Sequence, residues 1–108
     1  MQPFSEKTIK QISKISDSHH VEFLFLFGSS LTKQFSEKSD YDFLVRFGEF
    51  EIEEYFDNYL SLKNELENLL GINIDLLEFQ TLTNPYLKES IKQNHKLIYG
   101  RKNTKMAL

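Results

Sequence analysis

The chain has 108 residues, of which 40% are hydrophobic and 27% charged, and its formal net charge is -3. These values are typical of a soluble globular domain and argue against a protein that grips long nucleic acid through a basic face. Since there is no cysteine, disulfides and thiolate ligands are excluded, and a metal would be held by oxygen or imidazole. The apolar runs are far shorter than the ~20 residues of a membrane span, and no apolar signal segment opens the chain, so we expect a cytoplasmic protein without membrane contacts.

The first elements are a helix and a buried strand. Ser5 is a helix cap, and Ile9, Ile12 and Ile15 form an apolar stripe that predicts a helix ending near 17–18. The segment 21–27 is almost continuously apolar and β-preferring, which predicts a strand covered on both faces.

A polar connection leads to the second strand. After Gly28, the four-residue spacing of Leu31 and Phe35 predicts one or two helical turns, followed by a polar loop over 36–39. The second strand is predicted over 40–45. Period-two alternation places Asp40, Asp42 and Leu44 on one face of it.

The rest of the chain alternates helix and strand. Apolar residues at helical spacing predict a long helix over 53–70, which Gly71 ends, and 72–77 reads as a third strand carrying Asp75. Asn84 and Pro85 start a further helix, and 96–99 forms a short edge strand. This alternation predicts an α/β (α+β) fold with a small mixed or mostly parallel sheet and helices packed against it. We expect residues 1–100 to form this single domain and residues 101–108 to form a flexible basic tail.

Three carboxylates are the main chemical signal. Asp40 and Asp42 project from one strand face about 7 Å apart, and two close carboxylates need a positive partner. Magnesium, which prefers oxygen ligands, fits such a pair. If the second and third strands pair, Asp75 joins them. A single Asp-x-Asp is common and more often sits at a solvated strand end.

The combined pattern is more specific than any of its parts. Gly28-Ser29, ten further residues, Asp40-x-Asp42 preceded by Ser39, and a later strand with Asp75 resemble the signature of minimal nucleotidyltransferases in the DNA polymerase β superfamily. The resemblance covers nearly the whole chain and implies the polymerase β-like nucleotidyltransferase fold.

The resemblance also implies roles for these residues. Gly28 and Ser29 match the turn that binds the β- and γ-phosphates of a nucleoside triphosphate, for which ATP is expected. Asp40, Asp42 and Asp75 match the catalytic carboxylates that ligate two Mg2+ ions. Two such ions activate an attacking oxygen and stabilise the leaving pyrophosphate.

Family members have small helical partners, the HEPN-type toxins, so the resemblance implies an antitoxin that transfers AMP to a hydroxyl of a toxin. Two alternatives stay open: a catalytically inactive module that neutralises its partner by binding, and a nucleotidyltransferase for small molecules. The chain departs from the family at Ser30 and Lys33, where basic residue and glycine are usual. These changes affect a phosphate contact and the end of the short helix but no metal ligand.

For several other residues, a structural role is weighed against a functional one. The adjacent His19 and His20 cannot share one face, so a surface loop is favoured over metal ligation. Arg46 either reaches a phosphate or pairs with Glu22 or Glu49. The aromatic residues at 55, 56 and 59 are assigned to core packing in preference to a partner interface.

Overall fold

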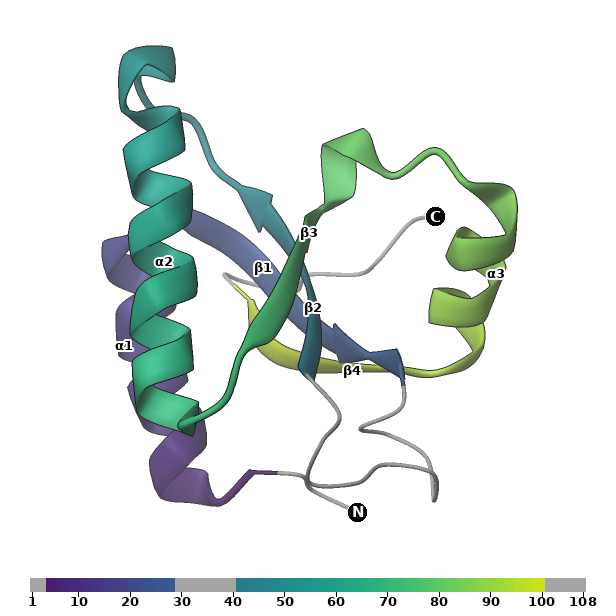
Figure 1. The fold of residues 1–108 in the computed structure, drawn as a ribbon, viewed down its shortest axis with the longest axis horizontal. Coiled ribbons are helices and arrows are strands. Elements are labelled where there is room, and N and C mark those ends of the chain that lie inside the picture. The colour runs from purple at the N-terminus through teal and green to yellow at the C-terminus, as the bar shows by residue number, and fades with distance from the viewer. Residues whose placement is uncertain (1–3, 29–40, 101–108) are drawn as a thin grey trace.

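A computed structural model describes residues 4–28 and 41–100 of the chain (Figure 1). Two short 3-10 helices, η2 (Ile52–Glu54) and η3 (Phe79–Thr81), accompany three α-helices and four strands within these residues. In chain order the helices and strands are α1 (Glu6–Ser18), β1 (Val21–Phe27), β2 (Tyr41–Phe47), α2 (Tyr55–Leu70), β3 (Ile74–Glu78), α3 (Pro85–Gln93) and β4 (His95–Gly100). The predicted α/β class is confirmed.

The four strands form one mixed sheet in the order β3-β2-β1-β4. β1 runs antiparallel to both β2 and β4, and only β2 and β3 are parallel. A parallel pair needs a crossover connection, and α2 supplies one between β2 and β3. The alternative of a mostly parallel sheet is therefore wrong. Helices alternate with strands along the chain, but only one pair of neighbouring strands, β2 and β3, is parallel.

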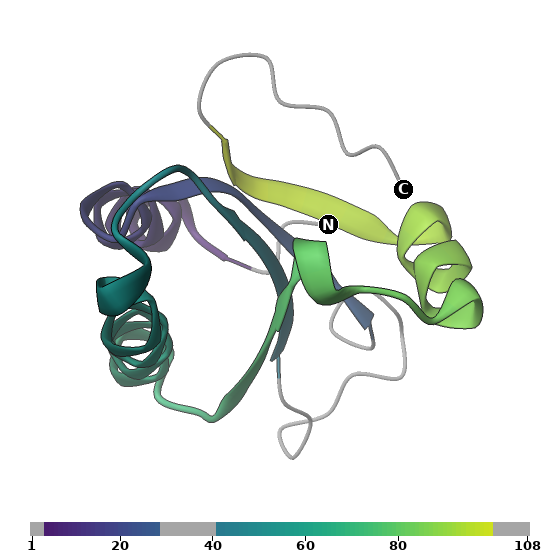
Figure 2. The ribbon, with the colours of Figure 1, turned by 90° about the horizontal axis from the view of Figure 1, so that it is seen from above.

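Each face of the sheet is buried by different helices (Figure 2). α1 and α2 lie together on one face, where Ile12, Leu62 and Leu66 pack against β1 and β2. On the other face, Ile91 of α3 packs with the three phenylalanines of β1. All seven residues of β1 except Glu22 are buried, which confirms the prediction of a strand covered on both sides.

The predicted helix ends agree with the structure. Ser5 caps α1 by accepting a hydrogen bond from the Thr8 N–H, and Asn84 caps α3 by accepting from the N–H groups of Tyr86 and Leu87. Gly71 ends α2 with a φ of 74°, in the left-handed region where glycine is favoured.

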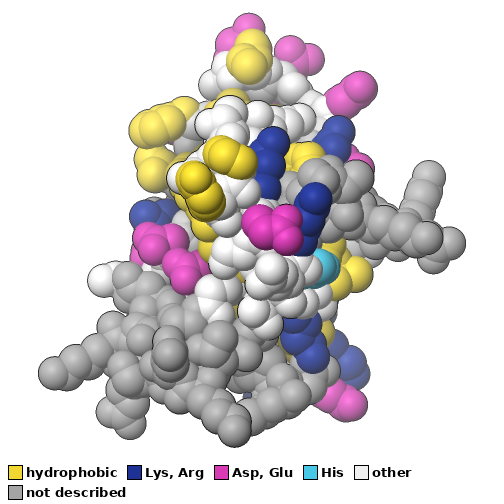
Figure 3. Space-filling model, turned by 90° about the vertical axis from the view of Figure 1, so that its right-hand side faces the viewer, with side chains coloured by type: hydrophobic (Ala, Val, Ile, Leu, Met, Phe, Trp, Pro, Cys, Tyr) yellow, Lys and Arg dark blue, Asp and Glu magenta, His cyan; other side chains and the backbone are white. Residues whose placement is uncertain are grey.

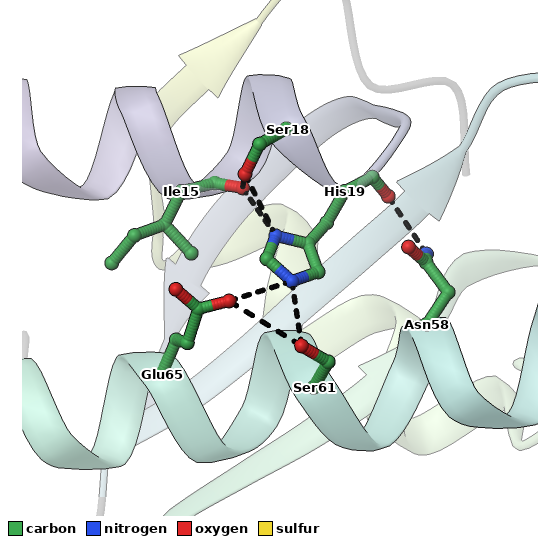
Figure 4. A network of polar contacts seen from close by, with 6 residues as sticks. All are labelled: Ile15, Ser18, His19, Asn58, Ser61 and Glu65. Atoms are coloured by element: carbon green, nitrogen blue, oxygen red, sulfur yellow. Dashed lines mark hydrogen bonds and ion pairs between the residues drawn. The ribbon is translucent and has the colours of Figure 1, made fainter.

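His19 corrects the prediction of a surface loop. Its ring is buried between α1 and α2, with Nδ1 2.7 Å from the Ile15 carbonyl oxygen and Nε2 2.9 Å from Ser61 Oγ and 2.7 Å from Glu65 Oε2 (Figure 4). The Asn58 side chain donates to the His19 carbonyl. This histidine therefore ties the end of α1 to α2, through partners that lie far along the chain.

None of the helices in the described residues has the length and apolar character that crossing a membrane requires. The predicted helical turns after Gly28 and the predicted tail over 101–108 lie outside the described residues.

Candidate active site

The strand register brings two of the predicted carboxylates together. Asp42 lies near the start of β2 and pairs directly with Asp75 on the neighbouring parallel strand β3. Residues paired in this way point to the same face, and neighbouring strands are about 4.8 Å apart. Asp42 is half-buried and Asp75 is exposed, so the two carboxylates form a pair at the surface end of the sheet.

Gly28 approaches the same carboxylate from β1. Phe27, the last residue of β1, pairs with Asp42, and Gly28 follows with a φ of 83°. A Cβ atom at position 28 would lie 2.4 Å from Asp42 Oδ2 and 3.3 Å from its Cγ. Only glycine satisfies both the backbone conformation and this close approach. Gly28 therefore packs closely against the Asp42 carboxylate of β2.

This site lies on the sheet face that α3 covers. Leu44 follows two residues after Asp42 on β2 and belongs to the cluster that contains Ile91 of α3. Phe43 points to the opposite face, under α1 and α2. The α3 face therefore changes from an apolar core to carboxylates at one end of the sheet.

Two predicted residues, Ser29 and Asp40, lie outside the described residues. In the described part of the chain, no group of three or more histidine, cysteine, aspartate or glutamate side chains is arranged to hold a metal ion. The structure thus brings together Gly28, Asp42 and Asp75 of the predicted set, and the positions of the other two stay predictions.

His95 is a residue near this end of the sheet that sequence reasoning missed. It begins β4 and pairs with Phe27, so Asp75, Asp42, Phe27 and His95 form one row across the sheet. Its Nδ1 lies 2.7 Å from the Ile91 carbonyl oxygen, and because a carbonyl oxygen only accepts, Nδ1 is the donor in this contact. No motif marks this residue, and only strand pairing reveals its position.

The remaining candidates lie outside this row. Arg46 Nε is 3.6 Å from Glu22 Oε2, which confirms the ion-pair alternative. The hydroxyl groups of Tyr55 and Tyr59 donate to the Glu78 side chain and to the Leu76 carbonyl, as expected for packed residues. Phe56 differs, because 68% of it is exposed and the prediction of core packing is wrong there. The three predicted residues of α2 therefore divide between core and surface.

The chain is similar to known proteins in sequence and in fold. The model of the family described as "Polymerase beta, Nucleotidyltransferase" matches residues 9–104. A protein of Methanocaldococcus jannaschii named "Putative protein adenylyltransferase" is 36% identical over 101 residues, which cover 86% of this chain and 98% of that protein.

Solved structures show the same fold. One described as "putative minimal nucleotidyltransferase" has a TM-score of 0.68 and 27% identity, covering 83% of this chain and 88% of that chain. A complex of a tri-AMPylated Shewanella oneidensis HEPN toxin with an MNT antitoxin contains a chain with a TM-score of 0.61 and 18% identity, covering 90% and 73%. Together with the family model, these similarities confirm the predicted fold, and the chain belongs to the polymerase β-type nucleotidyltransferase family.

Proposed function

We propose that this nucleotidyltransferase moves AMP from ATP to a hydroxyl group of a HEPN-type toxin and thereby acts as its antitoxin in the cytoplasm. The observation that carries the proposal is the in-register pair of Asp42 and Asp75 beside Gly28. The name of the archaeal relative supports a protein acceptor, and the complex of an AMP-modified toxin with its antitoxin supports the choice of partner.

The carboxylate pair fits magnesium. Two neighbouring strands present one carboxylate each to the same face, and hard oxygen donors of this kind suit Mg2+. We propose that Asp42 and Asp75, with Asp40, hold two ions. When bound, Mg2+ neutralises phosphate charge and lowers the pKa of an attacking oxygen.

Residues of the chain bind and orient the nucleotide, and one of them accepts the proton of the acceptor hydroxyl. Gly28 and Ser29 bind the β- and γ-phosphates, where the absence of a side chain at 28 lets the backbone approach. The acceptor oxygen then bonds to the α-phosphorus, and the bond from that phosphorus to the bridging oxygen breaks. Pyrophosphate leaves with the bonding electrons, and the hydroxyl proton passes to Asp75. The product is an AMP ester of the toxin.

A transfer assay tests this proposal. The purified chain is incubated with ATP labelled at the α-phosphate, Mg2+ and a HEPN-type toxin, and label on the toxin is measured. We expect labelling that Asp42→Ala abolishes. Glu89→Ala is the matched control, because Glu89 is an exposed acid on α3, and it should label normally.

Two results would contradict this proposal. If Asp42→Ala and Asp75→Ala label the toxin as well as the unaltered chain, the proposed site is wrong. If no variant labels the toxin but all of them neutralise it, the chain acts as a binding module and transfer is not its function.

A further inference from the structure

The start of α2 carries an apolar surface that no described part of the chain covers. Ile52, Phe56 and Leu60 are 79%, 68% and 38% exposed. They are spaced four residues apart across η2 and α2, and residues at this spacing lie on one side of a helix. We call these three residues the α2 stripe. It extends over about two helical turns, or roughly 12 Å at 1.5 Å per residue.

A cavity adjoins the stripe. It has a volume of about 410 Å3, and Ile52 lines both the cavity and the stripe. Phe47, Phe50 and Tyr55 line it as well, with ring centroids 5.7 to 6.1 Å apart. Glu49 adds a carboxylate to the wall. A carboxylate beside aromatic rings suits a lysine or arginine, whose aliphatic stem packs on the rings while its charged end meets the carboxylate.

The segment that carries the stripe is acidic. Residues 47–62 contain five acidic side chains and no lysine or arginine, and all five are exposed: Glu49, Glu51, Glu53, Glu54 and Asp57. At the top of Figure 3, which corresponds to the start of α2 in Figure 1, hydrophobic and acidic side chains lie next to one another. An apolar surface with an acidic rim is complementary to a partner that presents apolar and basic side chains together.

This surface is separate from the candidate active site. Phe47 ends β2, whereas Asp42 lies near its start, so the cavity and the carboxylate pair are at opposite ends of the strand. A partner can occupy the α2 stripe without covering the site.

We infer that the α2 stripe and the adjoining cavity are a docking surface for a basic amphipathic helix of a partner protein. The apolar side of the partner helix packs on Ile52, Phe56 and Leu60, in the manner of helix-in-groove recognition. A lysine or arginine of that helix enters the cavity beside Glu49. The inference does not depend on the proposed transfer reaction.

A peptide titration tests this inference. The probe is a synthetic amphipathic helix of leucine and lysine, about 14 residues or four turns long, added to the isotope-labelled full chain and followed by amide NMR. We expect saturable shifts confined to residues 47–61 and to Gln80, which also lines the cavity, with an affinity that falls as salt is raised. Phe56→Ser should weaken binding at least about tenfold, as loss of a central anchor does.

Matched controls distinguish binding at this surface from nonspecific hydrophobic binding. Tyr86→Ser removes a side chain that is 86% exposed on α3 and should leave the peptide affinity unchanged. A peptide with glutamate in place of lysine should not bind. Because Phe56 and Tyr86 are exposed, neither variant should unfold the chain, and circular dichroism checks this.

Four results would overturn the inference. The first is peptide shifts that map outside residues 47–61 and Gln80, and the second is equal binding of the glutamate peptide. The third concerns other occupants: if Phe56→Ser converts a dimer to a monomer in sedimentation, a second copy occupies the stripe. If removal of residues 101–108 raises the peptide affinity, the basic tail of the chain itself competes for it.

Discussion

Gly28 has a left-handed backbone conformation and also lies close to the Asp42 carboxylate. Its replacement therefore affects both the stability of the chain and the candidate active site. Gly28→Ala introduces a Cβ 2.4 Å from Asp42 Oδ2 at a φ of 83°. We expect the backbone strain to cost about 1–2 kcal/mol of unfolding free energy. The displaced carboxylate should lower nucleotide transfer by about a hundredfold, since misplacing a catalytic group by 1 Å has effects of that order. Urea unfolding and the transfer assay measure the two effects.

Gly71→Ala is the matched control for this variant. Gly71 has a similar φ of 74°, but nothing lies within 4 Å of the position that its Cβ would take. Its stability loss should be comparable and its transfer activity unchanged. Equal activity losses in the two alanine variants would show that the contact between Gly28 and Asp42 has no part in catalysis.

Glu78 links stability to pH. Burial raises the pKa of the Glu78 carboxyl above its ordinary value. The folded state therefore holds this proton more tightly than the unfolded state, and the contribution of Glu78 to stability falls as pH rises from the unfolded to the folded pKa.

Glu78→Gln should remove this decline. Urea unfolding measured at several pH values from 4 to 7 tests it, with Glu89→Gln as the control because Glu89 is an exposed acid on α3. Unfolding curves of Glu78→Gln that keep the pH dependence of the unaltered chain would contradict the assignment.

Among the helices, α3 depends on its cap. Asn84 Oδ1 accepts hydrogen bonds from the Tyr86 and Leu87 N–H groups, at 2.9 and 3.3 Å. Asn84→Ala should lower the unfolding free energy by about 0.5–2 kcal/mol, because these N–H groups lose their acceptor. Thermal or urea unfolding measures the loss.

Asn94→Ala tests whether the loss is specific to the cap. Asn94 ends the same helix through its backbone N–H, which bonds to the Ser90 carbonyl and is retained in alanine. A loss for Asn94→Ala as large as for Asn84→Ala would show that the side-chain cap contributes nothing particular to α3.

Local signals predicted the elements better than their pairing. Caps at Ser5 and Asn84 and the glycine after α2 determine helix ends through neighbouring backbone groups, and all three agree with the structure. Strand limits were less accurate: β3 begins at Ile74, two residues later than predicted. Strand ends depend on hydrogen bonds to other strands, which no local pattern contains.

At the scale of the whole molecule, the sequence pattern indicated which residues belong to the site but not how they meet. The resemblance selected Gly28, Asp42 and Asp75, and the period-two alternation put the aspartates on definite strand faces. Their proximity follows from the register of β2 against β3 and from the close approach of β1. Both are long-range properties of the folded chain.

Long-range packing also explains the residues that were missed. His19 is buried because α2 lies against α1, and His95 joins the site row because β4 pairs with β1. The α2 stripe reads as an ordinary core pattern in sequence, since apolar residues at helical spacing look alike whether they face the sheet or solvent. Only the assembled fold separates Leu62 and Leu66, which are buried, from Phe56.

The central claim is that the in-register carboxylates of β2 and β3 hold the metal ions that accompany the nucleotide. Paramagnetic broadening of amide NMR signals by Mn2+ in the presence of ATP tests it most directly, because the ion marks the residues nearest to it. We expect the signals of Gly28, Asp42 and Asp75 to broaden first, the signal of Asp57 to stay sharp, and Asp42→Asn to remove the effect. Broadening centred on the acidic residues 49–57, with Asp42 and Asp75 unaffected, would contradict it.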